Sequence, residues 1–377
     1  MTSAKKFTML LLGVLLAISA AVPVALPDDD GSDPAASASV GVIRPSMVEM
    51  LDESHTGGVV TLAELRRDTL GSRGHLATGA GVDVALIDTG VSPVDGLDGD
   101  KVIHGPDLSG EGSSPEAAYL DTYGHGTHMA GIIAGDRPGH QGIAPEARIV
   151  SVKVAGHDGL TTVPQVIAAI DWVIEHGQSD GLNVRVLNLS LGLADVSDHR
   201  GDLLSAAVER AWDAGIFVVV AAGNSGDSQL HLDSPAIDPY ILAVGAADQM
   251  SHAVQTQRDV PTWSARGEIG RNPDLVAPGR SIASYRVPGS TIDQAAPHAR
   301  LGNDLVLGSG TSQSAAVMSG LAAAIINRYP ETTPDRLKHT IVKDAESVAG
   351  YTATDAGNGH VEGVDSIEGQ ARNKTQT

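Results

Sequence analysis

Five apolar segments recur along the chain, separated by more polar stretches. They are VDVALID (82–88), ARIVSVKVA (147–155), VRVLNLSL (184–191), GIFVVVAA (215–222) and YILAVGAA (240–247). Most of them are continuous and do not alternate with polar residues, which is typical of strands buried on both faces of a sheet. The pattern therefore predicts a largely parallel sheet enclosed by other elements.

Helical patterns lie between and after these segments. They cover 128–135, 162–177, 201–215, 312–330 and 333–348, and several begin at a polar residue and end at Gly. A weaker pattern at 61–70 also predicts a helix. Alternating strands and helices predict an α/β fold, a three-layer sandwich with a mostly parallel central sheet flanked by helices. We place this domain at 58–368.

The amino-terminal region has the composition of a targeting segment. Lys5 and Lys6 precede a long apolar run that contains Ser19 and Ala21 at a spacing suited to cleavage. Residues 1–25 are therefore predicted to be the signal peptide of a secreted, extracellular protein. An uncleaved anchor is the alternative, because the run approaches the ~20 residues that span a bilayer. We interpret 26–57 as a flexible linker or short pro-segment and 369–377 as a polar tail.

Composition argues against several classes of function. The 46 acidic and 25 basic residues give a net charge of -21, which repels phosphate backbones and anionic lipids. Only 3 Trp, 6 Tyr and 2 Phe are available to stack on bases, so we expect no nucleic-acid partner. The chain has no cysteine, which excludes disulfides, thiolate metal sites and a cysteine nucleophile.

Asp88 ends the first apolar segment, in VALIDTGV. This position predicts a carboxylate at the carboxyl edge of a buried strand, where open α/β sheets place their sites. A turn-capping Asp is one alternative, and the D-T-G tripeptide of aspartic peptidases is another. A two-lobed aspartic peptidase needs a second such tripeptide, which this sequence lacks.

His125 lies in DTYGHGTHMAGIIAG, where Gly124 and Gly126 allow close backbone packing at the start of a predicted helix. His128 lies about one turn further along. Two His at this spacing could form a metal pair, but no acidic ligand accompanies them as in H-E-x-x-H. We expect His128 to be structural.

Ser312 and Asn224 also occupy positions suited to chemistry. Ser312 begins a helix of small and apolar residues, where backbone N–H groups and the helix dipole face a developing negative charge. Asn224 follows a strand in FVVVAAGNSG. A helix cap for Ser312 and a turn for Asn224 are the ordinary readings of each residue alone. The joint occurrence of Asp, His, Asn and Ser at such positions favours acyl transfer.

The ordered motifs VALIDTGV, GHGTHMAG, LNLSLG, AAGNSG, VAPG and GSGTSQSAA resemble those of the subtilisin-like serine peptidases, or subtilases, over residues 58–365. The resemblance implies a secreted endopeptidase that works through an acyl-enzyme. It implies a triad of Asp88, His125 and Ser312, with Asn224 as an oxyanion-hole donor. It further implies two substrate-binding segments, namely Ser190, Leu191 and Gly192, which pair with substrate as a strand, and Ala221, Ala222 and Gly223, which line the site of the residue before the scissile bond.

This resemblance also sets expectations about partners. The chemistry needs no cofactor, and pairing through main-chain atoms favours extended polypeptide substrates and broad specificity. We expect a monomer that leaves the membrane once the signal peptide is cleaved. Two rival hypotheses are a catalytically silent binding protein with the same fold and a membrane-anchored processing peptidase with one dedicated substrate.

Three features depart from the family pattern. Gln313 and Ala316 stand where many subtilases have Met and Pro. The connection AGDRPGHQ after the His helix is shorter than the calcium loop of some relatives, so structural calcium stays open and we name no metal ligand. About 30 residues between signal and domain are few for a folded pro-domain.

Overall fold

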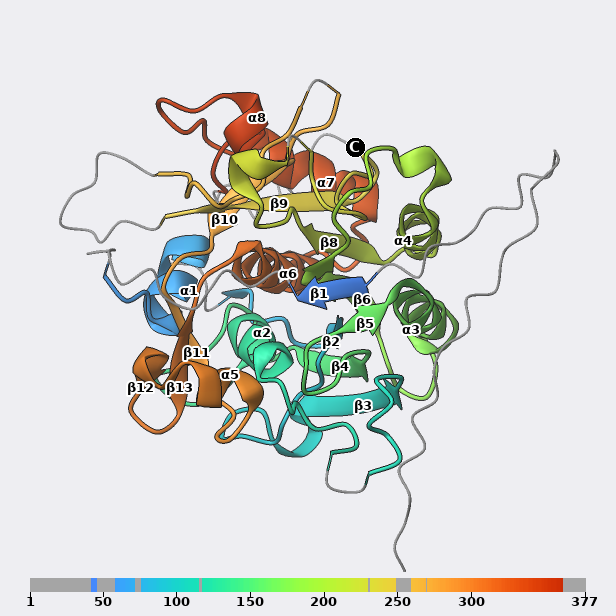
Figure 1. Ribbon diagram of the computed structural model, residues 1–377, viewed down its shortest axis with the longest axis vertical. Helices are drawn as coiled ribbons and strands as arrows, with labels where there is room; N and C mark the ends of the chain where they lie inside the picture. The colour runs from blue at the N-terminus through green and yellow to red at the C-terminus, as the bar shows by residue number, and fades with distance from the viewer. Residues whose placement is uncertain are drawn as a thin grey trace, which may run out of the picture. The chain divides into compact units, whose positions relative to one another are not determined.

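Seven parallel strands form the central sheet in the order β10-β9-β8-β6-β2-β4-β3 (Figure 1). The computed structural model describes residues 42–45, 58–71, 76–114, 117–229, 231–248, 259–268 and 270–361, all within one compact unit, Val40–Thr377. The strands are β2 (Asp83–Asp88), β3 (Val102–Asp107), β4 (Arg148–Lys153), β6 (Val184–Leu189), β8 (Phe217–Ala221), β9 (Leu242–Ala247) and β10 (Leu275–Pro278).

Helices cover both faces of this sheet. The major ones are α2 (His125–Ala134), α3 (Val163–His176), α4 (Leu203–Asp213) and α6 (Thr311–Arg328). Helix α2 lies in the connection from β3 to β4, whereas α3 and α4 lie in the connections from β4 to β6 and from β6 to β8. Figure 1 shows α2 and α6 on one face of the sheet and α3 and α4, which pack against each other, on the opposite face. Helix α6 packs against α2 and the sheet, which completes the predicted three layers.

Helix α6 is enclosed along most of its length. Every residue from Thr311 to Ile326 is buried, and the sequence there consists mainly of Ala, Ser and Gly with a few larger apolar residues. Small side chains let neighbouring backbone approach closely. A Cβ added to Gly320 would lie only 2.6 Å from Cβ of Ile143. The nucleophile candidate Ser312 thus begins a helix that is part of the core itself.

Two smaller sheets flank the central one. Strands β11 (Ile282–Tyr285), β13 (Leu305–Gly308) and β12 (Arg300–Leu301) form an antiparallel sheet. Strand β1 (Val42–Pro45) lies between β5 (Thr161–Thr162) and β7 (Leu191–Gly192), antiparallel to both. The remaining helices are α1 (Leu62–Leu70), α5 (Thr291–Ala295), α7 (Pro334–Lys343) and α8 (Ala353–Ala356).

The structure confirms the fold class, with small differences at element ends. All five predicted strands and the predicted helices are present. Helix α7 ends at Lys343 and not near 348, because Glu346 instead forms a β-bridge with His360. Across the described part of the chain, no helix combines the length and apolarity needed to cross a bilayer. The predicted signal peptide and polar tail lie outside the described residues.

Candidate active site

Three of the predicted site residues follow neighbouring strands of the sheet. Asp88 is the last residue of β2, Ser190 comes directly after β6, and Asn224 comes shortly after β8. These strands are adjacent in the order β8-β6-β2 and run in the same direction. Their carboxyl ends therefore bring the three residues to one edge of the sheet, as open α/β sheets do with their sites.

Asp88 and His125 form a buried pair. The imidazole Nδ1 lies 2.7 Å from Oδ1 and 2.9 Å from Oδ2 of Asp88. His125 is 0% exposed and Asp88 is 3% exposed. When the Asp88 carboxylate is the acceptor of this bond, Nδ1 is the donor, and Nε2 is then the acceptor of a neutral ring. His125 Nε2 is buried and has no hydrogen-bond partner among the described residues.

A second carboxylate holds the turn that precedes His125. Asp121 accepts hydrogen bonds from the N–H groups of Gly124 at 2.6 Å and Thr127 at 2.7 Å, and from the Thr89 hydroxyl at 2.8 Å. The Thr89 oxygen in turn accepts from the N–H of Gly126 at 2.9 Å. Burial raises the pKa of Asp121, although these donors oppose the shift. The start of α2 is thus fixed on both sides of His125.

Ser312 is tied to the strand edge at Ser190. Its hydroxyl donates to the Ser190 carbonyl at 3.1 Å, and the Ser190 hydroxyl donates back to the Ser312 carbonyl at 3.2 Å. Asn188 Nδ2 donates to the Ser190 hydroxyl at 2.8 Å, and Ser319 donates to Asn188 Oδ1 at 2.9 Å. These side chains lock α6 against β6, so the position of the Ser312 hydroxyl is determined by the core.

Asn224 meets the first residue of α6. Its Oδ1 accepts from the Thr311 N–H at 2.9 Å and from the Thr311 hydroxyl at 3.0 Å, and this hydroxyl also accepts from the Gly223 N–H at 3.2 Å. Because the amide oxygen is committed to Thr311, the Nδ2 donor end points away from it. Asn224 therefore stands beside the first turn of the helix that bears Ser312.

The two predicted substrate-binding segments are close to each other. Residues Leu191 and Gly192 form β7, and Ala221 ends β8. A Cβ added to Gly192 would lie 2.8 Å from Cβ of Asp233, and one added to Gly223 would lie 2.6 Å from Asp233 Oδ2. One side chain, that of Asp233, therefore contacts both segments.

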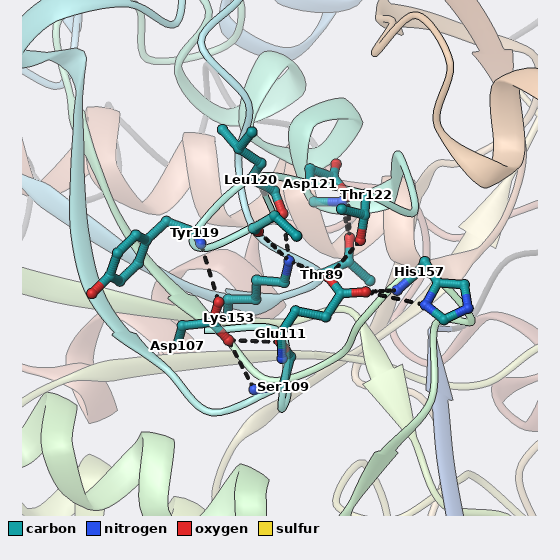
Figure 2. A network of polar contacts seen from close by, with 12 residues as sticks. Thr89, Asp107, Ser109, Glu111, Tyr119, Leu120, Asp121, Thr122, Lys153 and His157 are labelled. Atoms are coloured by element: carbon teal, nitrogen blue, oxygen red, sulfur yellow. Dashed lines mark hydrogen bonds and ion pairs between the residues drawn. The ribbon is translucent and has the colours of Figure 1, made fainter. Parts of the chain in front are cut away.

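A polar network centred on Lys153 supports the loop that precedes His125. Lys153 pairs in register with Asp88 across β4 and β2, and its Nζ donates to Glu111 at 2.7 Å and to the Leu120 carbonyl at 2.6 Å (Figure 2). Glu111 also accepts from the His157 N–H at 2.9 Å. Burial works to raise the pKa of Glu111, but the bonds from Lys153, His157 and a threonine hydroxyl lower it to about 2.

His128 and Gln313 lie together in the buried region near the nucleophile. A Cβ added to Gly308 would lie 2.5 Å from Gln313 Nε2 and 2.9 Å from His128 Cε1. Burial lowers the pKa of His128 to about 3, so its ring is neutral. Within the described ranges, no group of three or more His, Asp or Glu side chains is arranged to hold a metal ion.

Sequence reasoning did not single out several residues of this region. Asp121 stands four positions before His125, and its place in the same motif was the available signal. The fold alone brings Thr89, Lys153 and Glu111 to this region, because they come from distant parts of the sequence. Asp233 follows an irregular stretch, and nothing in its local sequence distinguishes it from a turn residue.

Known proteins are similar to most of this chain. The subtilase family model matches residues 79–370. Serine protease AprX of Bacillus subtilis (strain 168) is 34% identical over 307 residues, which cover 79% of this chain and 68% of that protein. Subtilisin BL of Lederbergia lenta is 32% identical over 277 residues, covering 72% of this chain and 86% of that protein.

A solved structure shows the same fold. Fervidolysin from Fervidobacterium pennivorans, described as a keratinolytic enzyme related to subtilisin, superposes with a TM-score of 0.64 at 24% identity. The match covers 86% of this chain and 51% of fervidolysin. The family model and the two curated relatives confirm the resemblance carried by the sequence motifs: the chain belongs to the subtilase family and is a serine-type endopeptidase.

Proposed function

We propose that this protein is a secreted endopeptidase that hydrolyses peptide bonds through Asp88, His125 and Ser312 and an acyl-enzyme. The observation that carries the proposal is the hydrogen bond from the Ser312 hydroxyl to the Ser190 carbonyl. Ser190 directly precedes β7, and β7 pairs with an extended segment of polypeptide, β1. A nucleophile candidate and a peptide-binding edge thus meet at one residue.

The proposed chemistry assigns each group one task. The Ser312 hydroxyl exchanges the Ser190 carbonyl for His125 Nε2, gives its proton to that nitrogen and attacks the substrate carbonyl carbon. Asp88 stabilises the resulting imidazolium through Nδ1. His125 then protonates the departing amine. In the second half of the reaction a water molecule gives a proton to His125 and attacks the acyl carbon, and His125 returns this proton to Ser312 Oγ as the carboxylic acid is released.

The oxyanion is assigned to two donors at the start of α6. These are the N–H of Ser312 and the Nδ2 group of Asn224, whose other end is held by Thr311. Donors that are already fixed need no rearrangement when charge develops on the substrate oxygen. No step of this scheme requires a cofactor, and structural calcium is left without an assigned site.

The binding mode of β1 supports extended polypeptides as substrates. Its residues Arg44 and Pro45 face Gly192 and Leu191, while Val42 and Ile43 face Thr162 and Thr161 of β5. The groove between β5 and β7 therefore accepts a chain in β conformation by main-chain pairing. In the same register, the next substrate residue faces Ser190 and precedes the scissile bond.

The parts of the chain before the domain receive proposed roles as well. We assign 1–25 to a signal peptide, 26–57 to a short pro-segment and 58–368 to the peptidase domain. Because β1 belongs to this pro-segment and fills the peptide-binding groove, it competes with substrate until it is displaced or removed. The mature protein is proposed to be an extracellular monomer without a nucleic-acid partner, consistent with the net charge of -21 of the full sequence.

A serine-directed fluorophosphonate tests the proposal. The wild-type protein should be labelled and should cleave an unfolded protein substrate, and Ser312→Ala should abolish both. Ser314→Ala is the matched control, because it makes the same change two residues along α6, where the hydroxyl only donates to the Ala277 carbonyl at 2.9 Å. Labelling or turnover that survives in Ser312→Ala refutes the assignment, while a folded wild-type protein that binds peptide without reacting supports the silent alternative.

A further inference from the structure

The carboxylate of Asp233 is fastened between the two segments assigned to substrate. Its N–H donates to the Ala222 carbonyl at 3.0 Å, and the adjoining Ser234 pairs with Leu193 through reciprocal hydrogen bonds of 2.9 Å. The backbone on both sides of the side chain is therefore held, one side to the strand after β7 and the other to the turn after β8. These main-chain bonds hold the Cα of Asp233 between the two segments.

Glycine on each segment leaves room for this carboxylate. Any Cβ at Gly223 would approach Oδ2 to 2.6 Å, and any Cβ at Gly192 would approach the Asp233 Cβ to 2.8 Å. Real Cβ atoms do not make contacts this short, so the glycines and the carboxylate fit one another. The acidic group borders the two segments through their main chain, with no side chain of either segment between them.

One oxygen of the Asp233 carboxylate has no hydrogen-bond partner among the described residues. Oδ1 of Asp233 is shielded from solvent and accepts no hydrogen bond from any described residue. Burial raises the pKa of Asp233 to about 6, His231 opposes this shift, and Asp195 adds to it. A desolvated carboxylate oxygen without a donor is unfavourable, and a cationic donor is the group that best relieves it.

We propose that Asp233 determines specificity by selecting Arg or Lys as the substrate residue immediately before the scissile bond. This inference rests on the proposed function, because it uses the register in which that residue faces Ser190, between Gly192 and Gly223. It narrows the broad specificity expected from main-chain pairing alone. The cationic side chain reaches Asp233 and supplies the donor that Oδ1 lacks.

Matched peptides test the inference on the wild-type protein. The series shares one sequence and differs only before the scissile bond, with Arg, Lys, citrulline, norleucine and Leu. Citrulline keeps the shape of Arg without its charge, and norleucine keeps most of the length of Lys. A charge-assisted hydrogen bond predicts that kcat/KM for Arg and Lys exceeds that for their neutral counterparts by roughly 10- to 100-fold. Equal values for Arg and citrulline would overturn the proposal.

Variants at Asp233 give a second, independent test. Asp233→Asn should remove the preference for Arg over citrulline while retaining turnover of the Leu peptide, and Asp233→Glu should keep a preference for cations. His231→Gln is the control for the neighbouring cation and should leave the preference for Arg in place at neutral pH. A preference for Arg that is unchanged in Asp233→Asn assigns the selection to another group and refutes the inference.

The pH dependence of the ratio of kcat/KM values for two peptides separates this proposal from the proposed function. Both peptides need the same base, so the effect of His125 cancels in the ratio of kcat/KM for Arg to that for norleucine. Because the pKa of Asp233 is raised to about 6, the ratio should fall as pH drops through about 6, and His231→Gln should retain this fall. Fluorophosphonate labelling with no cation preference refutes the inference alone, whereas no labelling and no cleavage refute the proposed function with it.

Discussion

Thr89→Val tests whether the Thr89–Asp121 link positions His125. The substitution preserves the shape of the side chain but removes its hydroxyl. Asp121 then loses the donor at 2.8 Å, and the buried N–H of Gly126 loses its acceptor at 2.9 Å. Gly126 immediately follows His125 in α2, so a shift of this backbone moves the imidazole relative to Asp88.

The expected magnitude follows from these two contacts. A hydrogen bond to a charged acceptor contributes about 1.5–3 kcal/mol, and a buried N–H left without an acceptor costs about 1–3 kcal/mol. Thr89→Val should therefore lower the free energy of unfolding by about 2.5–6 kcal/mol. Displacement of a catalytic group by about 1 Å can reduce the rate roughly 100-fold, so kcat should fall about 10- to 100-fold with little change in KM.

Chemical unfolding and steady-state kinetics on one peptide provide the assay, with Thr89→Ser as the matched control. Serine keeps the hydroxyl and loses only a methyl group, so it should destabilise by about 1 kcal/mol and retain most of kcat. If the Val and Ser variants agree in stability and in kcat, the hydroxyl does not position His125. A loss confined to KM would also contradict the argument, because the hydroxyl lies on the side of the catalytic pair and not in the groove.

Three further predictions address other parts of the site. Asn224→Ala should lower kcat by roughly 100- to 1000-fold with a small effect on KM, a magnitude taken from the measured loss of a subtilisin oxyanion donor; a pure KM effect would remove Asn224 from this role. Ile43→Asp places a charge at a fully buried position of β1, so the strand should leave the groove and KM for a short peptide should fall; an unchanged KM would mean that β1 does not compete. Glu111→Gln should destabilise the protein at neutral pH. Because the pKa of Glu111 is lowered to about 2, its ionised form stabilises the fold fully above pH 4.5, and this stability is lost as the pH falls toward 2. The free energies of unfolding of the two proteins should therefore converge between pH 4.5 and 2, and a constant difference would contradict the linkage.

The fold was predictable because its signals are local. A continuous apolar run such as 215–222 specifies a strand buried on both faces, and small residues in 312–330 specify an enclosed helix. Short motifs at the ends of these elements predicted the candidate site residues Asp88, His125, Ser312 and Asn224 in the same way. Parallel strand order places Asp88 and Asn224 at one edge of the sheet, and hydrogen bonds place His125 beside Asp88 and Ser312 beside Ser190.

The roles of the residues that support the site were not predictable, because their contacts form only when distant segments of the chain come together. Lys153 bonds Glu111 across 42 positions of sequence, and Asp233 contacts Gly192 and Gly223 from a stretch without regular structure. Strand β1 has too few residues to show periodicity, and its conformation depends on β5 and β7 on either side. Such contacts become visible only in three dimensions.

The enclosure of α6 has a consequence for hydrogen exchange and for the lifetime of the arranged site. Helix ends ordinarily fray and exchange their amide protons quickly, but the first turn of α6 is buried at Thr311, Ser312 and Gln313. The Thr311 N–H also donates to Asn224 Oδ1 at 2.9 Å, so this end of the helix cannot fray without breaking that bond. We expect deuterium uptake at the Thr311 amide to be as slow as in the central strands, so that the start of the helix that bears Ser312 keeps its orientation for as long as the molecule remains folded.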